Sequence, residues 1–136
     1  MHQVELHPYL QQWDLKKFCE QNGIYMTAYY PLGGARNMSS DDAVIKHPTI
    51  VSIANKHNKT PAQILIRWCI QRGVVCIPKS VHANRIEENG NVFDFELTSE
   101  EMELIRAMDR HLRYSLPTII LSSQDSSEAY FDNEDI

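Results

Sequence analysis

Two basic side chains and a hydroxyl group follow a short apolar run in the second half of the chain. The run VVCIP (residues 74–78) leads directly into Lys79 and Ser80, and Arg85 follows in a helical pattern. Functional groups of α/β proteins gather where strands end. An arginine fork, a lysine charge, a hydroxyl and free helix N–H groups together suit a phosphate group. The spacing alone leaves a second interpretation open, in which Lys79 and Arg85 are solvated charges flanking a helix.

Other chemistries find less support in the residue types. The six histidines invite a metal interpretation, but His2 and His7 are an odd number of residues apart, so a strand would point them to opposite faces. No cysteine joins them at zinc-ligand spacing, and we predict no metal site. The sequence contains no GxSxG elbow, P-loop or GxGxxG fingerprint.

Composition indicates an ordinary globular domain. The 136 residues are 43% hydrophobic and 23% charged, and the net charge is −5. No lysine or arginine follows Arg113, whereas five acids do, so nothing favours a nucleic-acid partner. No apolar run is long enough for a membrane span, and no signal peptide opens the chain. Three cysteines without a CxxC pair favour a reduced, cytoplasmic setting.

The candidate side chains depend on alternating strand and helix signals. Thr60 with Pro61, and Thr98 with Glu101, are typical helix starts. The run at 74–78 resembles a strand that is buried on both faces of a parallel sheet. Three parallel strands would leave open edges that need covering. The expected elements are strands at 2–6, 24–30 and 74–78, helices at 11–23, 48–58, 61–73, 84–89 and 99–110, and a long loop at 31–48.

Two stretches carry a family resemblance. HQVELHPYLQQWDLKKFCEQNGIYMTAYYPLGG (residues 2–34) and HNKTPAQILIRWCIQRGVVCIPKSVHANRIEENGNVFDFELTSEEM (residues 57–102) resemble the middle and C-terminal parts of aldo-keto reductases, especially the aldose-reductase-like branch. The resemblance implies an α/β fold that is the C-terminal portion of a (β/α)8 TIM barrel: its last three strands, their helices and the tail. Residues 1–110 would form the partial barrel with the cofactor-phosphate site, and residues 111–136 the tail and substrate-loop region.

The resemblance also implies that NADPH is the cofactor and assigns roles by position. Gln3 would bind the nicotinamide carboxamide, and Tyr29 would stack on the nicotinamide ring. Lys79, Ser80 and Arg85 would hold the 2′-phosphate. Further cofactor contacts would come from Pro31, Leu32, Gly34, Val81, Glu88 and Asn89, with Val81 donating its backbone N–H and the last two touching the adenine.

Three positions depart from the family pattern. His2 stands where an asparagine is common, and Tyr30 stands where a serine commonly contacts the pyrophosphate. Arg36 lies near the place of an acidic residue that latches a loop over the cofactor in some members, and this loop is short here.

The family's catalytic tyrosine, lysine, aspartate and histidine belong to motifs that do not occur here, so no catalytic residue is assigned. Two hypotheses follow. In one, the chain is the cofactor-binding half of an NADPH-dependent reductase of aldehydes or ketones, and is inactive alone. In the other, it is a non-catalytic remnant that serves as a structural subunit in a larger assembly, with Met1 a genuine or an annotated start. Either way, a protein partner or self-association would cover the open sheet edges. The apolar tail residues would border the substrate pocket or cap the barrel: Leu116, Ile119, Ile120 and Leu121.

Overall fold

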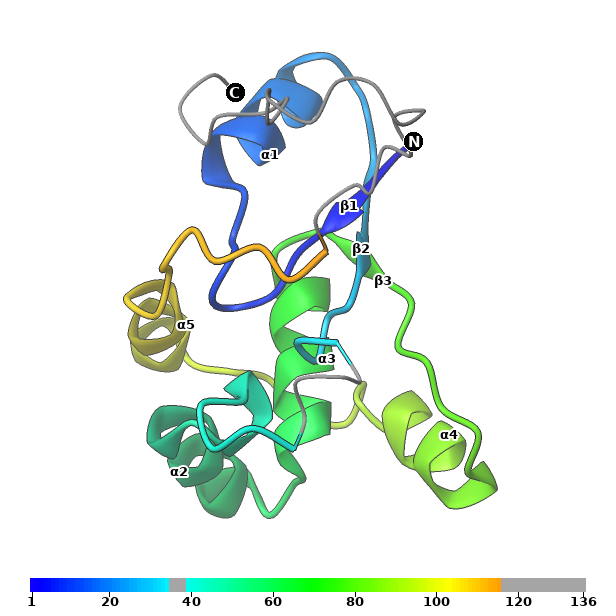
Figure 1. The fold of residues 1–136 in the computed structure, drawn as a ribbon, viewed down its shortest axis with the longest axis vertical. Helices are drawn as coiled ribbons and strands as arrows, with labels where there is room; N and C mark the ends of the chain where they lie inside the picture. Colours follow the sequence, from blue (N-terminus) through cyan, green and yellow to red (C-terminus); the bar gives the residue numbers. More distant parts are fainter. Residues whose placement is uncertain (35–38, 116–136) are drawn as a thin grey trace, which may run out of the picture.

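The chain folds into a three-stranded sheet with helices around it (Figure 1). The structure, a computed structural model, describes residues 1–34 and 39–115. Within these ranges, no helix is both long and apolar enough to cross a membrane. The elements are β1 (His2–Glu5), α1 (Trp13–Gln21), β2 (Met26–Tyr29), the 3-10 helix η2 (Val44–Lys46), α2 (Pro48–His57), α3 (Pro61–Gln71), β3 (Val75–Cys76), α4 (Ala83–Gly90) and α5 (Ser99–Arg106).

The sheet is parallel in the order β1-β2-β3, which confirms the expected parallel arrangement. Gln3 pairs with Thr27, which in turn pairs with Val75, so these three residues lie in one row across the strands. Since side chains alternate along a strand, one face carries this row and the other faces the helices. Ala28 on the helix-facing side is fully buried.

Strand β3 differs from its expected form. It spans only Val75–Cys76 rather than residues 74–78, and it is not buried on both faces. Val75 is 50% exposed and Ile77 is 46% exposed. The reason is that β3 lies at the edge of the sheet, so a neighbouring strand covers it on one side only.

Helix α3 is the central helix of the core. Thr60 caps it through a bond from the Gln63 N–H, and Pro61 occupies its first turn, as the sequence predicts. Gln63 returns a bond to the Thr60 N–H at 3.0 Å, which completes a capping box. The inward face of α3 carries four side chains that are almost completely buried: Ile64, Leu65, Trp68 and Cys69.

The sequence of α1 places Leu15, Phe18 and Cys19 on one apolar stripe, which predicts that they face inward. Cys19 is buried, but Phe18 is 57% exposed, so this prediction is wrong for Phe18. Trp13, which lies off the apolar stripe, has a clear role. Its ring lies 4.1 Å from the guanidinium of Arg72, which also lies 4.5 Å from the ring of Trp68. Arg72 is 6% exposed, and its burial lowers its pKa to about 10.

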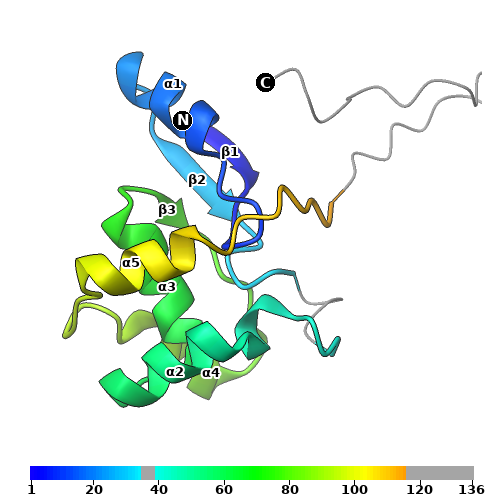
Figure 2. The same ribbon diagram turned by 90° about the vertical axis from the view of Figure 1, so that its left-hand side faces the viewer.

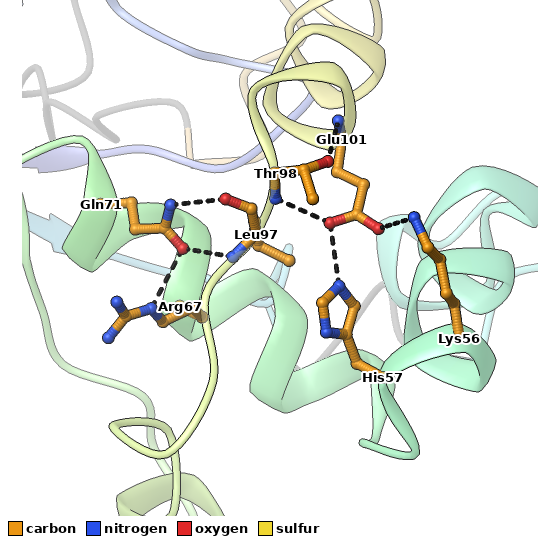
Figure 3. Close-up of polar contacts among 7 residues, drawn as sticks. All are labelled: Lys56, His57, Arg67, Gln71, Leu97, Thr98 and Glu101. Atoms are coloured by element: carbon orange, nitrogen blue, oxygen red, sulfur yellow. Dashed lines mark hydrogen bonds and ion pairs between the residues drawn. The ribbon is translucent and has the colours of Figure 1, made fainter.

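A buried carboxylate joins α2 to α5 (Figure 3). Glu101 lies in the first turn of α5, and its Oε2 accepts the Thr98 N–H at 2.8 Å, forming the expected capping box. The same carboxylate binds Lys56 Nζ at 2.8 Å and His57 Nε2 at 2.9 Å, both at the end of α2. Burial raises the pKa of Glu101, but these partners outweigh it and hold the pKa at about 2.

A second polar contact fixes the segment that leads into α5. The Gln71 amide accepts from the Leu97 N–H at 2.7 Å and donates to the Leu97 carbonyl at 3.0 Å (Figure 3). Arg67 Nε donates to the same amide oxygen at 3.1 Å. The end of α3 therefore holds the chain in the position from which α5 starts.

Candidate cofactor-phosphate site

The three residues of the candidate phosphate site follow β3. An extended segment leaves β3 and carries Lys79 and Ser80 to α4, which stands at the periphery of the molecule (Figures 1 and 2). Lys79 is exposed, and Val81 is 81% exposed. The Ser80 hydroxyl accepts the His82 N–H at 3.1 Å, which shapes the turn into the helix.

Arg85 lies in the first turn of α4, where a cation is electrostatically disfavoured by the helix dipole. The N-cap residue His82 makes no side-chain cap bond. Among the described residues, neither Lys79 nor Arg85 takes part in an ion pair. Two unpaired cations beside a helix start without a side-chain cap are well placed for an anion.

Helix α4 has no buried residue, so polar contacts to α3 hold it in place. The Thr60 hydroxyl donates to Glu88 Oε1 at 2.7 Å, and Gln63 Nε2 donates to the Glu88 carbonyl at 3.1 Å. The start of α3 thereby fixes the helix that carries Arg85. The resemblance assigns Glu88 to the adenine, but in this structure one of its oxygens already binds Thr60. Asn89 is half-buried beside it.

The residues assigned to the nicotinamide lie on β1 and β2. Gln3 is exposed, and Tyr29 is half-buried at the end of β2. Tyr29 pairs with Glu5, which is two residues after Gln3, so all three side chains belong to the same face of the sheet. The structure therefore brings Gln3 and Tyr29 to the same face of the sheet. Tyr29 lies on β2, next to the strand from which the Lys79 segment leaves, and Gln3 lies on β1 at the opposite edge.

The turn after β2 has an unusual backbone. Tyr30 has φ +54, and Gly33 and Gly34 have φ +86 and +76. A Cβ at Gly34 would lie 3.3 Å from the Tyr30 ring, so the turn suits glycine there. Pro31 and Gly34 are buried and Leu32 is half-buried, whereas Arg36 lies outside the described residues.

Glu5 ends β1 and His7 follows it, and the partners of these two side chains are not evident from the sequence. Neither side chain has any exposed surface, and His7 Nε2 lies 3.0 Å from Glu5 Oε1. The same carboxylate accepts the backbone N–H groups of Tyr114 and Ser115. The available signal was a carboxylate between two apolar residues, Val4 and Leu6, because a charge that is buried there needs partners. No group of three metal-ligating side chains is found in residues 1–34 and 39–115.

Comparison with known proteins decides the family. The profile of the Aldo/keto reductase family matches residues 1–110. The chain belongs to the aldo/keto reductase family. It is 46% identical over 127 residues to the aldo-keto reductase family 1 member A1-A of Danio rerio, covering 91% of this chain and 39% of that protein. It is 48% identical over 113 residues to the 9,11-endoperoxide prostaglandin H2 reductase of Trypanosoma cruzi, covering 83% and 38%.

The structural comparison agrees with the expected fold class. The crystal structure of Gox0644 in its apo form matches this aldo/keto reductase chain with a TM-score of 0.72 and 44% identity, covering 79% of this chain and 37% of that one. The three parallel strands and their helices are the C-terminal portion of a (β/α)8 barrel. The chain spans about two fifths of the length of the curated relatives it matches.

Proposed function

We propose that this chain supplies the binding site for the 2′-phosphate, and one wall of the nicotinamide site, of an NADPH-dependent reductase of aldehydes or ketones. The observation that carries the proposal is the pair of exposed, unpaired cations, Lys79 and Arg85, at the start of α4. Membership of a family that reduces carbonyl compounds with nicotinamide cofactors supports it. The exposed amide of Gln3 and the ring of Tyr29 suit the nicotinamide carboxamide and ring.

The division of labour follows from the chemistry. The cofactor, when bound, supplies the hydride. The residues of this chain bind and orient it: Lys79 as a point charge, Arg85 as a fork, and Tyr29 as a stacking surface. The tail residues expected at the substrate pocket lie outside the described residues: Leu116, Ile119, Ile120 and Leu121.

Nucleotide preference is the direct test. Titration of the purified chain with NADPH and with NADH, followed by fluorescence, should show tighter binding of NADPH. The reason is that only NADPH carries the 2′-phosphate that Lys79 and Arg85 would neutralise. Equal affinity for the two nucleotides would refute the assignment of the site.

We further propose that the chain needs a covering surface, either a protein partner or a second copy. A groove of about 510 Å³ runs beside β3, and most of its lining is apolar. On the side away from β2, the edge strand β3 also has no neighbouring strand among the described residues. The groove is lined chiefly by Tyr25, Ile66, Ile70, Val75, Val92 and Phe93. The same observation favours the alternative function, a non-catalytic subunit held in a larger assembly.

Size-exclusion chromatography tests this need. The purified chain is expected to elute above its monomer mass of 15.7 kDa, and Val75→Lys is expected to shift it toward the monomer. Leu104→Lys is the matched control, because Leu104 is 49% exposed but lies on α5. A monomer with a cooperative urea transition would contradict the proposal.

We expect the chain alone not to reduce a generic aromatic aldehyde, and measurable turnover would contradict that expectation.

A further inference from the structure

The carboxylate of Glu5 binds a segment that lies more than a hundred residues away in the sequence. Its Oε1 accepts the Tyr114 N–H at 2.6 Å, and its Oε2 accepts the Ser115 N–H at 2.7 Å. Figure 1 shows this segment running back from α5 to the end of β1. With His7 on Oε1 as well, both oxygens of a fully buried carboxylate have partners.

These bonds stabilise the charged form of Glu5. Burial alone raises the pKa of its carboxyl, but the bonds from His7 and from the two backbone N–H groups outweigh burial and lower it. Bonds from N–H groups to an ionised carboxylate are shorter and stronger than neutral ones. A buried charge that used only His7 would be poorly compensated, so the segment and the carboxylate stabilise each other.

The preceding residues of the segment have anchors of their own. The N–H groups of Arg110 and Leu112 both donate to the Tyr9 carbonyl, at 3.1 and 2.9 Å. The Arg110 guanidinium lies over the Tyr9 ring at 4.1 Å and binds both oxygens of Asp42 at 2.9 and 2.7 Å. These contacts hold residues 110–112 to the turn after β1, whereas Glu5 alone holds the backbone N–H groups of residues 114 and 115 to the sheet.

Glu5 holds residues 114 and 115 at the nicotinamide side of the proposed site. Glu5 pairs with Tyr29 across the sheet and shares a face with Gln3. The Tyr114 ring lies 5.0 Å from the ring of His7 and beside Gly33 in the turn after β2. The segment therefore crosses from the end of β1 toward the turn that follows Tyr29.

We propose that Glu5 is a positioning residue, whose carboxylate fixes the backbone of residues 114 and 115 as a wall of the nicotinamide site. This inference rests on the proposed function, because it presumes that the nicotinamide lies against Gln3 and Tyr29. It assigns Glu5 no contact with the reacting atoms. Its effect on the cofactor is transmitted through the segment.

The experiment combines amide hydrogen exchange with nucleotide titration. In Glu5→Gln, exchange at the Tyr114 and Ser115 amides is expected to rise at least about tenfold, because a neutral amide is a weaker acceptor than a carboxylate. NADPH and NADH affinities should fall by the same factor, since the segment lies at the nicotinamide and not at the 2′-phosphate. Both affinities would then be lower while the ratio of the NADPH and NADH affinities stays the same. Loss of a contact to the 2′-phosphate would instead change that ratio.

A second pair of variants leaves Glu5 intact, in case the buried substitution prevents folding. Ser115→Pro removes the N–H that donates to Oε2 and should reproduce the parallel loss of affinity and the faster exchange at Tyr114. Ser115→Ala keeps the N–H that donates to Oε2, so amide exchange at Tyr114 should stay as slow as in the wild type.

Three results would overturn the inference. Unchanged exchange in both Glu5→Gln and Ser115→Pro would show that the carboxylate does not hold the segment. Faster exchange with unchanged affinity would show that the segment is no wall of the site. Binding of neither nucleotide by the wild type would remove the proposed function and this inference with it, and the exchange data would then report the anchor alone.

Discussion

Replacing Arg85 with alanine is expected to weaken NADPH binding about 10- to 100-fold and to leave NADH binding nearly unchanged. A hydrogen bond to a charged group contributes roughly 1.5–3 kcal/mol, and each 1.4 kcal/mol changes affinity about tenfold. Arg85 is exposed and makes no ion pair among the described residues, so little is lost from the fold itself. The measurement is fluorescence titration of wild type and variant with both nucleotides.

Stability separates a binding role from a structural one. Arg85 lies in the first turn of α4, where a positive charge opposes the helix dipole. Its removal should therefore leave the urea midpoint unchanged or raise it slightly. If Arg85→Ala lowered the midpoint substantially, a structural role would explain its effect on binding.

Two control variants sharpen the result. Arg85→Lys keeps the charge but loses the two-pronged donor geometry, so its preference for NADPH should be intermediate. Lys17→Ala removes an exposed positive charge from α1 and should change neither affinity. If Lys17→Ala weakened NADPH binding as much as Arg85→Ala does, general charge attraction would explain the preference for NADPH over NADH. The assigned phosphate site would then be wrong.

Local signals allowed much of the fold to be predicted. The helix starts at Thr60 and Thr98 depend on residues three positions apart, so the sequence contains both partners of each capping box. The parallel order of strands follows from helices that separate them. Site residues at strand ends could also be proposed, but only the family resemblance connected Lys79, Ser80 and Arg85 with one ligand.

Features that depend on distant partners could not be predicted. The exposure of Val75 depends on β3 being an edge strand, which its apolar sequence does not reveal. Trp13 lies off the helical stripe because it packs on Arg72, which is far along the chain. Glu5 could be placed at the end of β1, but its backbone donors are 109 and 110 residues away.

Replacing Glu101 with glutamine is expected to cost about 2–3 kcal/mol of unfolding free energy at pH 7. The side chain is nearly isosteric, and glutamine can still serve in a capping box with Thr98, so the change removes mainly the charge. That charge binds Lys56 and His57 from a residue that is only 3% exposed. Urea unfolding of wild type and variant measures the difference.

The pH dependence of this difference identifies its cause. The folded pKa of Glu101 is about 2, below the ordinary value of 4.5, so the folded state favours the ionised carboxylate. The unfolded chain therefore binds the proton more tightly, and the stabilisation is complete above about pH 4.5 and is lost as the pH falls toward 2. A tenfold change in proton affinity corresponds to about 1.4 kcal/mol, so lowering the pKa from 4.5 to about 2 corresponds to about 3.5 kcal/mol. The cap bond that glutamine keeps reduces the expected loss to the roughly 2–3 kcal/mol given above. The difference in free energy of unfolding between wild type and Glu101→Gln should be constant from pH 7 to 5 and should decrease below pH 4.5.

Glu103→Gln is the matched control for this prediction. Glu103 lies on the same helix with its side chain 69% exposed, and it meets Arg106 at 3.5 Å. An exposed ion pair contributes about 0–1 kcal/mol, so this variant should unfold close to the wild type at every pH. The buried carboxylate would not be the charge that joins α2 to α5 in either of two cases. In one, Glu101→Gln has the same free energy of unfolding as Glu103→Gln. In the other, the difference in free energy of unfolding between wild type and Glu101→Gln stays unchanged down to pH 3. A confirmed narrowing would mean that one ionised side chain couples the end of α2 to the start of α5, and that acid loosens this junction.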